Sequence, residues 1–236
     1  MDWFNSDYYH ILYKNRDYKE AEKFLKKIIK KLQLDKGLKV LDLACGKGRH
    51  SIFLEKQGFK VSGIDNSLNN IKKAKLYQNK NLKFFKREMI EEIGGKFDVI
   101  FNLFTSFGYV NKEYNIKTIR NINNHLSQNG FVIIDYLNSK LAEDNLVKNE
   151  NKLIDGLEFR IKRYSDSVFI HKTIEFIDEK DYLFKERVMK LSLDDFKYYL
   201  EKHNLKIIKK FGNYNLDDFV EDKSERLIMI IKKSQP

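Results

Sequence analysis

The sequence predicts an α/β protein with three layers, in which a mostly parallel sheet lies between two layers of helices. Short apolar runs, typical of buried strands, alternate with segments whose apolar residues recur at helical spacing. This alternation continues from residue 38 to residue 137, and two spaced glycines follow its first apolar run. Strands that alternate with helices in this way form parallel sheets with right-handed crossovers.

The predicted elements of this region follow one another in a regular order. Ser67 is a suitable N-cap for the second helix, and the pair Asn129-Gly130 is a suitable stop for the third. We expect strands at 38–44, 59–64, 82–86, 97–103 and 131–137, with helices at 49–57, 67–79 and 111–128.

Residues 1–33 are expected to form an amino-terminal segment that ends in an amphipathic helix. Asp17 and Glu20 have the spacing of a capping box at the start of that helix. The apolar positions that follow recur at helical spacing, and they are Tyr18, Ala21, Phe24, Ile28 and Leu32.

The pattern changes after residue 150. Apolar stretches separated by polar turns predict an antiparallel β meander over 150–191, which we interpret as an insertion. Ser192 begins another predicted helix, and residues 192–236 also supply two strands that complete the sheet. We expect a single domain over 1–236, because this length suits one α/β domain.

The composition favours a cytoplasmic protein without a membrane segment or a metal. Hydrophobic residues make up 42% of the chain, but the apolar runs are too short to span a bilayer, and the amino terminus does not resemble a secretory signal. Cys45 is the single cysteine, so no internal disulfide forms. The five histidines show no spacing typical of metal ligands.

The net charge of +11 raises the question of nucleic-acid binding. Only eight of the 45 basic residues are arginines, the side chain that binds phosphate and guanine bidentately. The lysines are spread along the chain rather than clustered. We therefore expect a solvated lysine-rich surface and regard nucleic acid as a disfavoured partner.

The stretch "KVLDLACGKGRHSIFLEKQGFKVSGIDNS" carries the strongest functional signal. Gly46 and Gly48 lie where the first strand turns toward a helix, and glycines there let a ligand approach the backbone. Asp65 comes 19 residues after Gly46, where an acid can accept hydrogen bonds from ribose hydroxyls. The ligand is therefore expected to contain adenosine. Ser51 at the third glycine position and Asp42 within the strand argue against NAD and an oxidoreductase.

The runs "LDLACGKGRH" and "VSGIDNS" resemble the first two cofactor motifs of class I S-adenosylmethionine-dependent methyltransferases. The resemblance covers residues 38–137, which it identifies as the cofactor-binding core. It implies a Rossmann-like sheet of seven strands, mostly parallel with the last strand antiparallel. It also implies S-adenosylmethionine as cofactor and S-adenosylhomocysteine as product.

The resemblance assigns cofactor-binding roles by position. Asp42 and the backbone of Ala44–Gly48 would hold the methionine part, Asp65 the ribose, and Asn66 would lie beside the adenine. Tyr13, in an aromatic amino-terminal lid with Tyr9 and Tyr18, would face the sulfonium. The complete predicted cofactor set is Asp42, Ala44, Cys45, Gly46, Gly48, Asp65, Asn66, Glu88, Met89, Asn102 and Tyr13.

The acceptor is expected to be a small molecule, and no catalytic residue is singled out. A general base is optional, with Tyr109, His171 and Tyr214 as candidates by expected location. The alternating apolar residues of the meander either pack in a core or dimer interface or roof the acceptor, so a monomer and a homodimer both stay open. The candidate acceptor residues are Tyr9, Phe107, Tyr109, His171 and Tyr214.

Two other functions stay open at this point. The first is methylation of RNA such as tRNA, although the segment "FDVIFNLFTSFGYV" lacks the N/D-P-P-Y/F signature of enzymes that methylate base amines. The second is a non-catalytic module that binds S-adenosylmethionine or a protein partner, because a fold alone does not confer activity.

Overall fold

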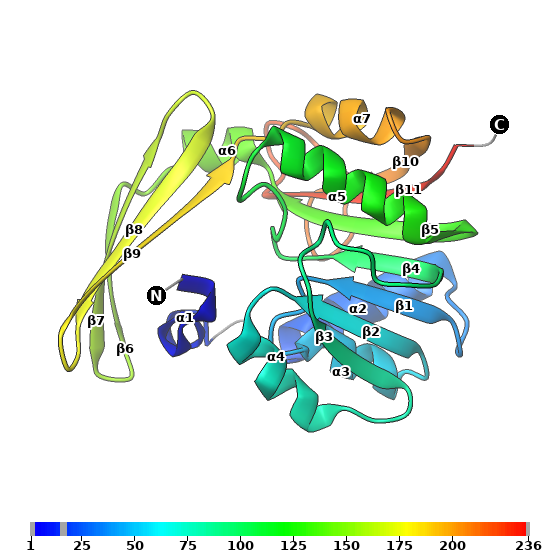
Figure 1. The fold of residues 1–236 in the computed structure, drawn as a ribbon. Helices are drawn as coiled ribbons and strands as arrows, with labels where there is room; N and C mark the ends of the chain where they lie inside the picture. Colours follow the sequence, from blue (N-terminus) through cyan, green and yellow to red (C-terminus); the bar gives the residue numbers. More distant parts are fainter. Residues whose placement is uncertain (1–2, 15–17, 235–236) are drawn as a thin grey trace.

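A seven-stranded sheet forms the centre of the computed structural model, which describes residues 3–14 and 18–234 (Figure 1). The strand order is β10-β11-β5-β4-β1-β2-β3, and β11 alone runs antiparallel to its neighbours. The predicted mostly parallel sheet with an antiparallel last strand is confirmed. Its strands are β1 (Lys39–Leu43), β2 (Lys60–Asp65), β3 (Leu82–Lys86), β4 (Phe97–Asn102), β5 (Leu126–Leu137), β10 (Leu205–Phe211) and β11 (Arg226–Lys233).

Helices cover both faces of this sheet and produce the three layers. On one face lie α2 (Tyr18–Leu32), α3 (Arg49–Lys56) and α4 (Leu68–Ala74), which continues as the short η2 (Lys75–Tyr77). On the other face lie α5 (Lys112–His125) and α7 (Leu193–Glu201). Successive strand residues point to opposite faces, so Val40 packs in the first core and Leu41 in the second.

A separate four-stranded antiparallel sheet stands beside the main sheet (Figure 1). The helix α6 (Ser139–Asp144) connects the two sheets, and the inner face of the small sheet packs against η1 (Trp3–Asn5) and α1 (Asp7–Leu12). The buried indole of Trp3 lies 5.0 Å from the ring of Phe184 in this contact. The small sheet comprises β6 (Asn149–Ile154), β7 (Leu157–Ser165), β8 (Phe169–Ile177) and β9 (Asp181–Met189).

Several predicted boundaries differ from the structure. The helix predicted at 111–128 ends at His125, and Asn129-Gly130 lies inside β5 rather than acting as a stop. The reason is that Leu126 is fully buried and pairs with Phe97, so the chain becomes extended earlier. A register shift between β4 and β5 then accommodates the extra residues.

The other predictions to compare with the structure are two helix starts and the strands of the small sheet. Ser67 caps α4 as predicted, because its hydroxyl accepts from the backbone N–H of Asn70 at 3.1 Å. The capping box of Asp17 and Glu20 and the side chain of Tyr18 lie outside the described residues. The strand β6 was not expected, because its sequence "NENKLI" is mostly polar and exposed.

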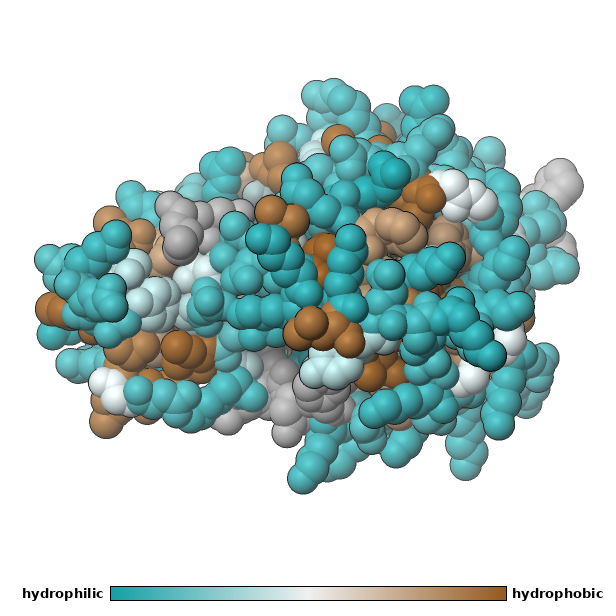
Figure 2. Space-filling model, turned by 60° about the horizontal axis from the view of Figure 1, so that its bottom comes forward, coloured by the Kyte–Doolittle hydropathy of each residue, from teal (hydrophilic) through white to brown (hydrophobic). Residues whose placement is uncertain are grey.

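The face of the molecule seen in Figure 2 is largely hydrophilic, with apolar residues scattered in small groups. Many lysines of the described residues are exposed, as the composition predicts. Within residues 3–14 and 18–234, no helix combines the length and apolar character needed to cross a bilayer.

Candidate active site

A cavity of about 780 Å³ lies at the carboxyl ends of strands β1 to β5. Its opposite walls come from the amino-terminal segment and the inner face of the small sheet. Ligands of open α/β sheets bind at this end of the strands, and the volume is typical of a ligand pocket. Of the residues predicted from the sequence, the lining contains Tyr9, Tyr13, Ala44, Gly46, Asp65, Asn66, Glu88, Met89, Tyr109 and Tyr214.

The carboxylate of Asp65 joins the first two loops of the site. Its Oδ2 accepts the backbone N–H of Gly46 at 2.9 Å, and its Oδ1 accepts that of Ser67 at 2.9 Å. The side-chain amide of Asn70 also donates to Oδ1, at 3.2 Å. Burial raises the pKa of Asp65, while these three donors oppose the increase by stabilising the anion. The acid therefore shapes the loop as well as facing the cavity.

The glycine loop after β1 needs left-handed backbone at three positions. Ala44, Gly46 and Gly48 have φ values of 60°, 56° and 85°. A β-carbon on Gly46 would meet no protein atom within 4 Å, and Gly46 lines the cavity. A β-carbon on Gly48 would lie 2.6 Å from the ring of Phe84. Gly46 therefore leaves room for a ligand, whereas Gly48 allows close packing against the sheet.

Asp42, in β1, and Cys45 and Gly48, in the glycine loop, do not line the cavity. Asp42 is 1% exposed, and its Oδ2 accepts a 2.5 Å hydrogen bond from the hydroxyl of Ser51. Burial raises the pKa of Asp42 to about 7, although the Ser51 hydrogen bond acts in the opposite direction. Asp42 thus links β1 to the first turn of α3 across the glycine loop.

The loop after β3 supplies Glu88 and Met89 to the cavity. The phenol of Tyr114, on α5, donates to Glu88 Oε2 at 2.8 Å and fixes the carboxylate. Burial and then Glu88 raise the pKa of Tyr114. Asn102 lies behind this loop, where its amide nitrogen donates to Met89 Sδ and to the carbonyl of Leu43, both at 3.3 Å. Asn102 therefore supports Met89 without lining the cavity.

Aromatic rings form the wall that faces the glycine loop. The rings of Tyr9 and Tyr13 lie 4.9 Å apart, and those of Phe4 and Tyr109 lie 5.0 Å apart. Burial, with a contribution from Glu186, raises the pKa of Tyr109. The Tyr109 hydroxyl is therefore protonated near neutral pH and can donate a hydrogen bond. Phe4, Tyr9 and Tyr13 of the amino-terminal segment line the cavity, and the role of this segment as a lid stays a prediction.

A buried ion pair that was not predicted holds the loop after β4. Arg226 Nε donates to Asp135 Oδ1 at 2.8 Å, and Asp135 is fully buried. The other oxygen, Oδ2, accepts the backbone N–H of Phe104 at 2.8 Å and the phenol of Tyr214 at 3.1 Å. Phe104 and Thr105 have φ values of 59° and 56°, a strained conformation for residues with side chains. The acid inside the apolar run "FVIIDYL" was the available sequence signal.

His171 and Phe107 are not brought to the cavity. Ile170 and Lys172 line it, so the alternation of β8 directs His171 to the opposite face. There its Nε2 lies 2.7 Å from Asp166 Oδ2. Phe107 is fully buried and packs against Phe196 of α7, 5.5 Å between ring centroids.

Comparison with known proteins decides the family. Residues 13–210 match the family model described as a methyltransferase domain. The chain belongs to this methyltransferase family. A relative that bears a methyltransferase name in Geobacillus sp. (strain WCH70) is 22% identical to this methyltransferase over 240 residues, covering 96% of this chain and 97% of its own.

Solved structures share the fold of this chain. An S-adenosylmethionine-dependent methyltransferase from Clostridium acetobutylicum superposes with a TM-score of 0.82 at 22% identity, covering 97% of this chain and 96% of its own. The sugar N-methyltransferase KedS8 from Streptoalloteichus sp. gives a TM-score of 0.78 at 13% identity, with 96% and 93% covered. The resemblance to methyltransferases and the Rossmann-like fold predicted from the sequence are therefore confirmed.

Proposed function

We propose that this methyltransferase transfers the methyl group of S-adenosylmethionine to a small-molecule acceptor. The observation that supports this most directly is the continuity of the cavity. It extends from Gly46 and Asp65 to the inner face of the small sheet, so it can hold a cofactor and an acceptor together. Its enclosure by the lid and the small sheet favours a small molecule over RNA.

The residues at the main-sheet end fit the cofactor. The open space beside Gly46 admits a ligand against bare backbone. A carboxylate can accept about four hydrogen bonds, and three donors of the protein reach Asp65. Asp65 can therefore accept a further hydrogen bond from a ribose hydroxyl. Asn66, Glu88 and Met89 lie on the same side and would face the adenine.

The chemistry that the bound cofactor supplies is a methyl group on a sulfonium that leaves readily in an in-line displacement. The chain has to align the acceptor with that group and exclude water, and both effects accelerate such a reaction. The rings of Tyr9, Tyr13 and Tyr109 can stabilise positive charge near the reacting end through cation–π contacts. No general base is required if the acceptor is already nucleophilic.

Calorimetric titration with S-adenosylmethionine, S-adenosylhomocysteine and NAD in parallel tests the cofactor. We expect the first two to bind and NAD to show no heat. Binding of NAD alone would overturn the proposal. Methyl transfer is then tested with methyl-labelled cofactor, bulk RNA and a panel of small acceptors. Label on RNA alone would favour the RNA alternative, and cofactor binding without any turnover would favour the non-catalytic module.

A further inference from the structure

Four charged side chains form a row across the inner face of the small sheet. Glu150 comes from β6, Arg163 from β7, Lys172 from β8 and Glu186 from β9, and all four line the cavity. Arg163 pairs directly with Lys172, and Lys172 with Glu186, in the strand register. We call these four residues the charged row. Along the same face its neighbours toward α1, such as Ile161, are buried apolar residues.

The centre of the charged row places two cations side by side. An Arg163 terminal nitrogen lies 2.7 Å from Glu150 Oε2, and Lys172 Nζ lies 3.0 Å from Glu186 Oε1. The side chains of Arg163 and Lys172 are only 20% and 11% exposed. Like charges on directly paired strand positions are unfavourable, and partial burial strengthens the repulsion. An anion between the two cations would offset that repulsion.

The charge balance of the cavity also favours an anion here. Lys152 shares the carboxylate of Glu150 at 3.0 Å, so three cations of this face meet two carboxylates. The opposite end of the cavity carries the carboxylates of Asp65 and Glu88 together with the cation of Arg87. An anionic group entering the cavity is therefore attracted more strongly to the small sheet than to that end.

We propose that Arg163 and Lys172 bind an acidic group of the methyl acceptor, either a carboxylate or a phosphate. This inference rests on the proposed function, because it concerns the acceptor half of the same cavity. A guanidinium has five N–H donors, and the described contacts of Arg163 with Val147 and Glu150 engage two nitrogens. Arginine and lysine side by side suit a planar or tetrahedral oxyanion.

The tyrosine of the lid connects this anion site to the rest of the cavity. The hydroxyl of Tyr13 accepts a hydrogen bond from Lys172 and lies 3.5 Å from Glu186 Oε1. The apolar side chains of Ile170 and Val188 line the same wall and can contact the organic body of an acceptor. If the charged row had only a structural role, it would hold the amino-terminal segment in place. It would then bind anionic and neutral ligands equally.

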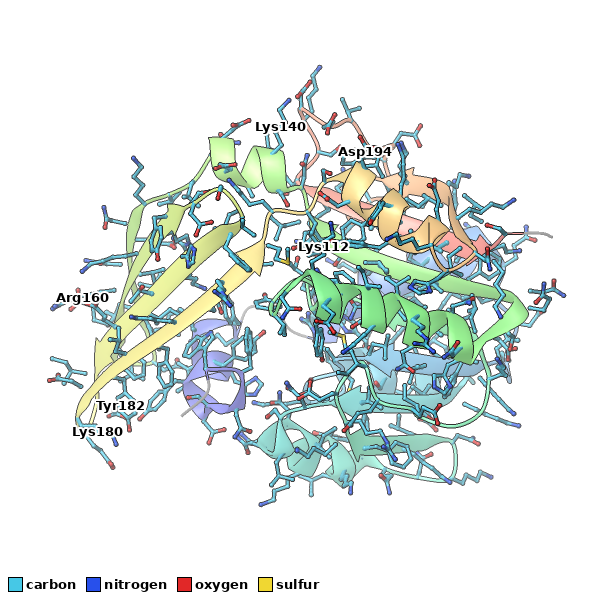
Figure 3. The ribbon with its side chains drawn as sticks, turned by 45° about the horizontal axis from the view of Figure 1, so that its top comes forward. Lys112, Lys140, Arg160, Lys180, Tyr182 and Asp194 are labelled. Carbon is cyan, nitrogen blue, oxygen red and sulfur yellow. The ribbon has the colours of Figure 1, made fainter. Side chains whose placement is uncertain are left out.

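The test uses the full chain saturated with S-adenosylhomocysteine and titrated at low ionic strength with benzoate, phenyl phosphate and neutral benzyl alcohol. The variant Arg163→Met removes one cation of the proposed site. Arg160→Met is the matched control, because Arg160 lies on the same strand, 60% exposed, and points outward from the small sheet (Figure 3).

We expect at least one of the two anions to bind more tightly than benzyl alcohol, and the tighter one identifies carboxylate or phosphate. Arg163→Met should weaken the binding of that anion by roughly tenfold or more, because a charge-assisted hydrogen bond is lost. Arg160→Met should leave the affinity unchanged. Arg163→Lys keeps the cation and should restore most of the affinity, even if Arg163→Met folds poorly.

Equal binding of neutral and anionic probes, equal effects of the two methionine variants, or no anion binding at all would overturn the inference. Binding of S-adenosylhomocysteine, measured first without probes, separates the two proposals. If that ligand does not bind, the proposed function fails. If it binds and the anions do not, only the anion site fails.

Discussion

The backbone N–H of Gly46 donates a 2.9 Å hydrogen bond to the Oδ2 of Asp65. This bond joins the loop after β1 to the end of the neighbouring strand β2. It holds the open backbone of one loop beside the acid of the other, and both line the cavity. A hydrogen bond of this kind limits the freedom of the two loops relative to each other, which would reduce the ordering cost of ligand binding.

Asp65→Asn should weaken binding of S-adenosylhomocysteine by about tenfold or more, because it removes the charge proposed to accept the ribose hydroxyls. It also turns an N–H group toward a backbone donor, so the free energy of unfolding should fall by about 1–3 kcal/mol. Calorimetry and urea denaturation measure the two effects. The exposed Asp144→Asn is the control. An unchanged Kd for folded Asp65→Asn would refute the ribose role.

Gly46→Ala and Gly48→Ala should separate binding from stability. The methyl group of Gly46→Ala would enter open space in the cavity, so cofactor affinity falls while stability drops by about 1 kcal/mol from the left-handed backbone. The methyl group of Gly48→Ala would overlap Phe84, so stability falls by about 2 kcal/mol or more. Thermal unfolding and calorimetry on both variants test this contrast, and the reverse pattern would contradict it.

The contribution of Asp42 to the stability of the protein should decrease as pH rises from about 4 to 7. Burial raises the folded-state pKa of this carboxyl to about 7 from an ordinary 3.8. In that interval the folded state retains a proton that the unfolded state has released, so the free energy of unfolding falls with pH. The contribution is at most about 4 kcal/mol.

The pH prediction is tested by urea denaturation of the wild type and Asp42→Asn at pH 5 and pH 8. Asparagine does not titrate, so the stability difference between the two proteins should change between these values. The exposed Asp35→Asn is the control and should follow the wild type. A pH-independent difference between Asp42→Asn and the wild type would show that Asp42 titrates normally.

Arg226→Met should lower the free energy of unfolding by about 3–5 kcal/mol, because it leaves the fully buried Asp135 without its cationic partner. It should also release the strained backbone of Phe104 and Thr105 and thereby increase local amide exchange. Lys140→Met is the matched control, because the Lys140–Asp222 pair is exposed and should contribute less than about 1 kcal/mol. Similar losses in both variants would contradict this.

The position of Gly46, Asp65 and Glu88 at one end of the cavity was predictable from a strand–loop–helix pattern, while their cofactor-binding role stays a prediction. Gly46, Asp65 and Glu88 each lie at the carboxyl end of a strand that periodicity identifies, and parallel strands bring those ends together. Asp42 was recognised as an acid within the first strand, but its hydrogen bond to Ser51 depends on how α3 folds back against β1.

The other end of the cavity was less predictable, because the alternation and the register of the strands determine which side chains face it. In β8 a difference of one residue separates Lys172, which lines the cavity, from His171, which lies on the opposite face. The partnership of Asp135 and Arg226 likewise depends on pairing between β5 and β11, segments far apart in the chain.

The sequence by itself determined the α/β class, the order of most strands and helices, and the positions of Gly46 and Asp65 at the ends of the first two strands. These depend on local periodicity and on short spacings, which neighbouring residues fix. Only the tertiary structure decided which side chains of the small sheet meet the lid and the cavity. The physical reason is that facing residues of paired strands come from distant segments, and only the packed register brings Arg163, Lys172 and Tyr13 together.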